Sequence, residues 1–237
     1  MPALNIIVAS LLYLELYVWR FGSASRRKIQ NAPISSRQYK REIKLTISTI
    51  TIYSLTGLAM YFLYINGYTK LYFNISQFGF FYLIISVPAM VLIHDTYFYW
   101  THRLLHISFF FKLIHRSHHL STNPCPWTAL SFHPIEAVIQ GAIALIIILV
   151  IPSHPLALFI FLAYSVITNM LGHTGIELVS YKQFFSKWFW WSNSSKLHND
   201  HHRYSKDNYG LYFTLWDTFM KTLSNKRSEK PNNKNII

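Results

Sequence analysis

Most of the twelve histidines in this 237-residue chain lie in short clusters after residue 100. The motifs WTHRLLH, HRSHH and LHNDHH place histidines three or four positions apart, so their side chains can share one face of a helix. Two more histidines stand alone in the motifs SFHP and LGHTG. The ten imidazoles are those of His102, His106, His115, His118, His119, His133, His173, His198, His201 and His202. Such a concentration is typical of a metal site.

The number of imidazoles indicates how many metals they could serve. One tetrahedral zinc takes four ligands, or three and a water when it is catalytic. Ten imidazoles suffice for two metals with about four or five nitrogen ligands each. Imidazole suits iron, zinc, copper and nickel, so the ligand type leaves the metal open. Taken singly, His133 and His173 are more typical of hydrogen-bonded structural residues.

Carboxylates near these motifs could orient the metal ligands. Asp95 lies seven residues before His102, on the same face of the predicted helix. A carboxylate there could accept the second ring proton of a ligating histidine and fix its tautomer. The alternative is a charge at a helix end that reaches water. Glu136 and Asp200, beside other histidine motifs, are candidates for the same supporting role.

The elements that position these residues are apolar. Hydrophobic residues make up 51% of the chain and charged residues 13%, against about 25% charged in soluble domains. Stretches 3–19, 45–65 and 78–100 are predicted to cross a membrane. Stretches 135–151 and 155–171, separated by PSHP, are predicted to enter the bilayer and return as a hairpin, with two full spans as the alternative. We therefore expect an all-α integral membrane protein: three transmembrane helices, an apolar helical hairpin and a histidine-rich helical cap.

Charge predicts the orientation. Loop 20–44 holds eight Lys and Arg against one Glu, whereas loop 66–77 holds only Lys70. By the positive-inside rule the first loop is cytoplasmic, which places the ten clustered histidines on the cytoplasmic face and leaves His154 at the hairpin tip. The same rule explains the excess of 22 Lys and Arg over 9 Asp and Glu better than nucleic-acid binding does. A bacterial cytoplasmic membrane and an endoplasmic-reticulum membrane both fit.

Three regions are expected along the chain. Residues 1–77 are predicted to form membrane-anchor helices with the basic loop, and 78–223 a histidine-rich catalytic domain. The polar tail 224–237 is predicted to be disordered.

The order of these motifs resembles a known family. The run HDTYFYWTHRLLH, then HRSHH, FHPIE, HTG and HNDHH, followed by NYG and TLWD, resembles the fatty-acid hydroxylase superfamily over about residues 91–221. That group includes sterol desaturases, methylsterol oxidases and lipid hydroxylases. The resemblance implies a non-haem diiron centre at the membrane surface, with all ten histidines as ligands. It also implies that Asn208, Tyr209 and Asp217 shape and support the site, although a turn at Asn208–Gly210 needs no metal. His94 is interpreted as a supporting or helix-end residue and His154 as structural.

The expected function is an O₂-dependent oxidation. Two iron ions, which zinc could replace in a purified sample, would use O₂ to hydroxylate or desaturate an unactivated C–H bond of a lipid. The lipid could be fatty acyl, sterol-like or another isoprenoid or ether lipid. Tyr97, Phe98, Trp127 and Phe132 are candidate pocket walls, or ordinary helix packing.

Electrons must come from a separate donor, such as a cytochrome or ferredoxin with its reductase. The chain has no G-x-G-x-x-G motif, and Cys125 is its only cysteine. The basic cytoplasmic surface could steer an acidic donor. The rival functions are a membrane zinc-dependent hydrolase, for which no H-E-x-x-H motif is present, and a metal-binding or transport protein, which would spread ionisable residues through the spans.

Overall fold

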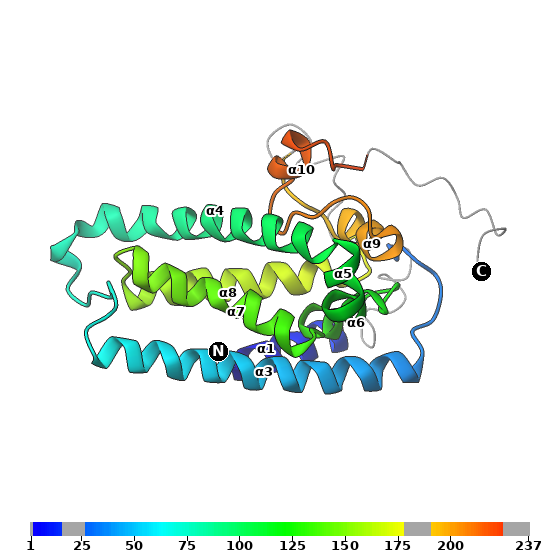
Figure 1. Ribbon diagram of the computed structural model, residues 1–237, viewed down its shortest axis with the longest axis horizontal. Coiled ribbons are helices and arrows are strands. Elements are labelled where there is room, and N and C mark those ends of the chain that lie inside the picture. Colours follow the sequence, from blue (N-terminus) through cyan, green and yellow to red (C-terminus); the bar gives the residue numbers. More distant parts are fainter. Residues whose placement is uncertain (1, 16–26, 178–190, 225–237) are drawn as a thin grey trace.

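A computed structural model describes residues 2–15, 27–177 and 191–224 of the chain (Figure 1). Within these residues the regular structure is helical, and β-pairing is limited to three isolated bridges. The predicted all-α class is therefore confirmed. The expected disordered tail lies almost entirely outside the described residues, and the division at residues 77 and 78 stays a prediction.

Four long helices lie side by side (Figure 1). They are α3 (Ser36–Ile65), α4 (Gly79–Leu105), α7 (Pro134–Val150) and α8 (Pro155–Gly172). Helices α7 and α8 form a hairpin that lies between α3 and α4, with α3 packed mainly on α7 and α4 mainly on α8. The short helix α1 (Pro2–Tyr13) packs against α3 and α8.

Helices α7 and α8 begin in the same way, because each starts at the proline of a His-Pro pair. The ring Nδ1 of His133 accepts a hydrogen bond from the Ile135 amide, and that of His154 accepts one from the Leu156 amide. Proline at the first helical position needs no amide partner and already has a helical φ. Each His-Pro pair thus defines where its helix starts, and the predicted structural role of His154 agrees with this.

The hairpin tip reaches the far end of the bundle. Ser153 donates its amide proton to the Lys70 carbonyl at 3.1 Å and accepts the Tyr72 amide proton at 3.2 Å. The tip therefore lies against the loop that joins α3 to α4, which contains the short η2 turn (Ile75–Gln77). The hairpin therefore runs along the bundle from the histidine-rich end to that loop.

Among the residues that the structure describes, three helices are long and apolar enough to cross a membrane, namely α3, α4 and α8. Helix α7, with 17 residues, is slightly shorter. The crossing predicted for stretch 3–19 stays a prediction. The described part of stretch 3–19 includes the 12-residue α1, about 18 Å long, which is short for a hydrocarbon layer of about 30 Å. The end of that stretch lies outside the described residues.

Apolar side chains both fill the bundle and cover its outside. Met90, Ile147, Ile148 and Phe161 are buried where α4, α7 and α8 meet. Many large apolar residues on the outer faces remain exposed, for example Leu58 of α3 and Phe81 of α4. An apolar exterior of this extent suits helices that contact lipid.

The remaining elements gather at the end of the bundle opposite the hairpin tip, where they form a cap (Figure 1). They are α5 (Ser108–Phe110), the π-helical turn η3 (Phe111–His115), α6 (Arg116–His119), the 3₁₀ turn η4 (Pro126–Leu130), α9 (Ser195–Tyr204) and α10 (Leu215–Phe219). Helix α4 runs directly into this cap. The cap brings together segments separated by about half of the chain.

Candidate metal centre

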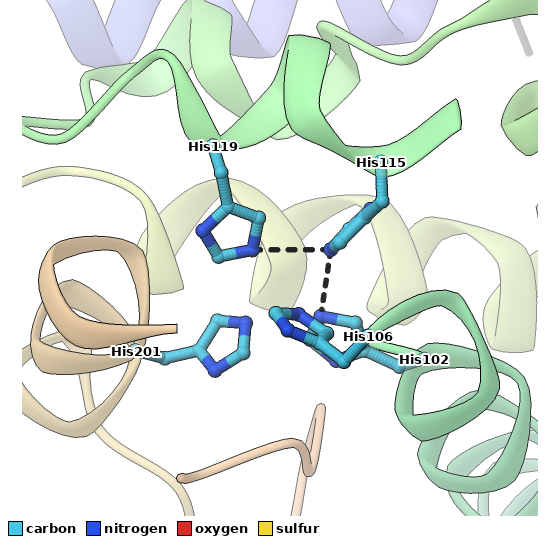
Figure 2. Close-up of side chains that lie close together, drawn as sticks. All are labelled: His102, His106, His115, His119 and His201. Atoms are coloured by element: carbon cyan, nitrogen blue, oxygen red, sulfur yellow. Dashed lines mark hydrogen bonds between the residues drawn. The ribbon is translucent and has the colours of Figure 1, made fainter. Parts of the chain in front are cut away.

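Nine of the ten predicted histidines converge in two buried groups within the cap. The five-histidine group consists of His102, His106, His115, His119 and His201 (Figure 2). The four-histidine group consists of His118, His173, His198 and His202. Within each group, one nitrogen from every ring lies within 4.8 Å of the others. This is the arrangement expected of ligands that share one ion.

The two groups are adjacent because consecutive histidines divide between them. His119 of α6 joins the five-histidine group while its neighbour His118 joins the other, and His201 and His202 of α9 divide likewise. Successive helical side chains point about 100° apart, so α6 and α9 each face both groups. Between the two groups, the ring centroids of His119 and His202 are 4.9 Å apart and those of His115 and His118 5.4 Å. Two neighbouring metals would fit this geometry.

Six rings are oriented by a bond from Nδ1 to a protein oxygen. The pairs are His102 with the Tyr209 carbonyl (2.8 Å), His115 with Glu136 Oε1 (2.7 Å), His118 with the Ser131 carbonyl (3.3 Å), His119 with Ser205 Oγ (2.9 Å), His173 with the Asn169 carbonyl (2.8 Å) and His201 with the Asp207 carbonyl (2.6 Å). A carbonyl can only accept, so the proton of such a ring is on Nδ1. The lone pair is then on Nε2, which is free to bind a metal.

The inner nitrogens have the environment that a bound cation would satisfy. The Nε2 of His115 lies 3.1 Å from the Nε2 atoms of both His102 and His119 (Figure 2). The Tyr209 carbonyl holds the proton of His102 on Nδ1, so the Nε2 of His102 turns its lone pair toward His115, as a ligand does toward a metal. The Nε2 atoms of His106 and His201 are buried with no hydrogen-bond partner among the described residues. The residues therefore fit a pair of metal ions.

Burial also keeps the rings neutral. Burial, and then repulsion from neighbouring rings, lowers the pKa of His118 and His198 well below the usual value. Burial lowers the pKa of His119 to about 3 and that of His173 to about 4. Neutral imidazoles at pH 7 have the lone pair that a metal ligand needs.

The NYG segment supports this site from the C-terminal side. Asp217 accepts hydrogen bonds from the amides of Tyr209 (2.9 Å) and Gly210 (2.8 Å) and so fixes the turn whose Tyr209 carbonyl orients His102. Asn208 has φ of 61°, and a Cβ on Gly210 would lie 2.2 Å from the Phe213 carbonyl. The segment is therefore both a tight turn and a support.

Three predicted site residues lie elsewhere. His133 belongs to neither group, and its Nδ1 serves as the N-cap of α7. Asp95 accepts from the amides of Tyr212 (2.9 Å) and Phe213 (3.3 Å) instead of from a ligand ring. Seven residues correspond to about 10.5 Å along a helix, which is too far for that predicted contact with His102.

Asp200, on α9, differs from its predicted role too. Its electrostatic neighbours are Lys196 and Arg203 of the same helix, and it has no hydrogen bond to a histidine within the described part of the chain. Among the predicted carboxylates it is Glu136 that bonds to a ring.

The carbonyls of Ser131, Asn169 and Asp207 had no sequence signal, because a carbonyl is present in every residue.

An apolar cavity of about 200 Å³ adjoins the metal centre, between α3, α4, α7 and α8. Phe98 and Phe132 line it, and their ring centroids are each 5.0 Å from a candidate ligand, His102 and His118 respectively. The other two predicted wall residues, Tyr97 and Trp127, are outside its lining. The cavity could therefore bring an apolar molecule to the edge of both groups.

The chain matches the family model described as fatty acid hydroxylase over residues 87–222, more than half of its length. It is 31% identical over 194 residues to a lathosterol oxidase of Homo sapiens (81% of this chain, 63% of the relative) and 35% identical over 185 residues to that of Rattus norvegicus (76% and 59%). It is 30% identical over 197 residues to a Delta(7)-sterol 5(6)-desaturase of Gibberella zeae (81% and 58%). The chain thus spans about three fifths of the length of these relatives. No solved structure matches it significantly.

Proposed function

Because the chain belongs to the fatty acid hydroxylase family, we propose that it is an O₂-dependent membrane oxidoreductase that hydroxylates or desaturates an unactivated C–H bond of a lipid. The observation that carries this proposal is the pair of adjacent buried histidine groups beside an apolar cavity. The names of the relatives, sterol oxidases and desaturases, favour a sterol-like lipid over a fatty acyl chain.

The two groups would each hold one iron ion. When bound, the irons supply the reduction of O₂ and the oxidising power needed to remove hydrogen from a C–H bond. The protein's own contribution is to hold the rings, since six of them are fixed through Nδ1 before any ion binds. Phe98 and Phe132 stand between the rings and the cavity, where they exclude water and bring the lipid close to the centre. The position of the lipid in the cavity would decide between hydroxylation and desaturation.

The cap would face the cytoplasm, where a separate electron donor could reach it. Helix α3 begins at the cap, since Gln38 and Arg41 hydrogen-bond to Asn123 and Ser121. The described residues just before it, 27–35, lie at the same end, where the backbones of Arg27 and Ile29 pair with those of Glu177 and Gly175. The positive-inside rule assigns such an end to the cytoplasm. A cytochrome or ferredoxin with its reductase would supply the electrons.

Metal content tests the proposal directly. The full chain, purified in detergent under iron-replete anaerobic conditions, should hold about two irons, and His102→Ala should hold fewer. With a reductant and O₂, the wild type should convert a sterol from a lipid extract to a hydroxylated or more unsaturated product, detected by mass spectrometry. One zinc per chain with no oxidised product would contradict the proposal and favour the hydrolase.

A further inference from the structure

Two polar side chains in the wall of the cavity have hydrogen-bonding groups without a partner. Gln140 of α7 is 8% exposed, and its amide forms no hydrogen bond with any described residue. His94 of α4 is 9% exposed, and within the described part of the chain its Nε2 has no partner either. Apart from Tyr53, the other polar side chains of the wall are engaged. For example, Thr56 donates to the Ile52 carbonyl and the Asn169 amide donates to that of Ala129.

The hydrogen bonds of His94 identify what its free nitrogen can do. The Tyr212 hydroxyl donates to Ser165 Oγ at 2.6 Å, and it lies 2.8 Å from the Nδ1 of His94. Since the phenolic proton is used in the first bond, the second needs the proton on Nδ1. Nε2 is then an acceptor, while the Gln140 amide offers both donors and an acceptor.

A ligand hydroxyl matches this pair. Both side chains line the same cavity, so the hydroxyl of a ligand there could donate its proton to the Nε2 of His94 and accept one from the Gln140 amide. The rest of the wall is mostly apolar, as in cavities where a few polar groups orient an apolar ligand. Tyr53, whose ring packs against Gly141 beside Gln140, adds a phenol that also has no hydrogen bond among the described residues.

The position of the pair relates the hydroxyl to the metal centre. His94 lies eight residues before His102, about 12 Å along α4. Gln140 lies one helical turn, about 6 Å, beyond Glu136, whose carboxylate contacts His115. A hydroxyl held here would present to the metals a C–H bond that lies several bonds away.

We propose that Gln140 and His94 bind the free hydroxyl of a lipophilic alcohol such as a sterol, and so determine which C–H bond faces the metal centre. This inference rests on the proposed function and names the substrate class of the same site. It makes the hydroxyl, rather than a carboxyl or an ester, the polar group that the cavity recognises.

Binding of a fluorescent sterol tests the proposal without turnover. The purified full chain is titrated with dehydroergosterol and with its methyl ether, and energy transfer from tryptophan is measured. The wild type should bind the alcohol about tenfold to 100-fold more tightly than the ether, and Gln140→Leu should reduce that preference nearly to one. Gln140→Met, which keeps the length of the side chain, should behave like Gln140→Leu.

The matched control is Thr49→Val, because Thr49 has a buried hydroxyl with no partner in the described part of the chain but lies outside the cavity wall. This variant should keep the wild-type preference. The melting temperature of Gln140→Leu should be unchanged or higher, because an unpartnered buried amide has been removed.

Equal binding of alcohol and ether by the wild type, binding of neither, or loss of the preference in Thr49→Val would overturn the proposal. A lower melting temperature of Gln140→Leu with the preference intact would do the same, since it would indicate a structural amide. Metal content separates this test from that of the proposed function. A strong preference for the alcohol in a protein that does not hold two irons would support the hydroxyl site and contradict the proposed oxidase function.

Discussion

The protein orients the five-histidine group more completely than the four-histidine group. Four of the five rings in the first are fixed by Nδ1 bonds, one of them to the carboxylate of Glu136. In the second, Nδ1 bonds to other described residues fix two of the four rings, those of His118 and His173. Both ring nitrogens of His202 lack a partner among the described residues. The Nε2 of His198 bonds to the neighbouring ring of His173.

This difference indicates two ways of building a metal site. The five-histidine group is arranged by hydrogen bonds before an ion binds, which lowers the cost of ordering its ligands. The four-histidine group depends more on the ion itself to fix its rings. We therefore expect the two sites to respond differently to loss of a ligand and to loss of a supporting group.

The largest effect should come from two neighbouring residues of α9. His202→Ala leaves three imidazoles in the less ordered group, so the metal content should fall from about two ions to about one. His201→Ala leaves four imidazoles in the better ordered group and should retain more metal. Oxidised product should fall by about 100-fold or more in both variants. Elemental analysis of the two variants, purified in parallel, shows which loses more metal. Equal loss in both would contradict the proposed difference between the two groups.

Loss of a supporting carboxylate should affect the five-histidine group specifically. Glu136→Gln replaces the carboxyl group that bonds to His115 with an amide, and should weaken the binding of one metal by about tenfold to 100-fold. Competition with a chelator of known affinity measures the affinity of each site, and one of the two ions should be released at a lower chelator concentration than in the wild type. The matched control is Asp200→Asn, because Asp200 is a carboxylate that bonds to no histidine among the described residues. If both variants released metal alike, the assigned role of Glu136 would be wrong.

Asp217→Asn should mainly affect folding of the cap. The carboxylate accepts from the amides of Tyr209 and Gly210, and an amide side chain can accept at only one of its two ends. The free energy of unfolding should fall by about 1–3 kcal/mol, with metal affinity little changed. Denaturation in detergent measures the first and elemental analysis the second. Loss of one metal at unchanged stability would show that Asp217 acts at the metal centre instead.

The smallest effect should come from a histidine outside both groups. His133→Ala removes the N-cap of α7 and should cost about 1 kcal/mol of stability, while both metals are retained. His154→Ala, which removes the equivalent cap of α8, is the matched comparison. If His133→Ala alone reduced the metal content to about one, His133 would be a ligand, as the family resemblance implies.

The long helices and the histidines that gather in the cap could be predicted from the sequence, because the length of an apolar stretch and the spacing of histidines are local properties. The separation of His118 from His119 into different groups could not, since it depends on how α6 sits against α9. The same is true of Asp95, whose partners are the amides of residues 212 and 213, more than a hundred positions away. The cavity and its unpartnered Gln140 likewise arise only when four helices pack together.

The two consecutive histidine pairs also have a mechanical consequence. Residues 118 and 119, like 201 and 202, are joined by a single peptide unit with Cα atoms about 3.8 Å apart. Any rotation or displacement of α6 or α9 therefore moves ligands of both groups together, and their separation changes little. Covalent geometry would thus limit how far the distance between the two ions can change, even when the surrounding membrane helices move.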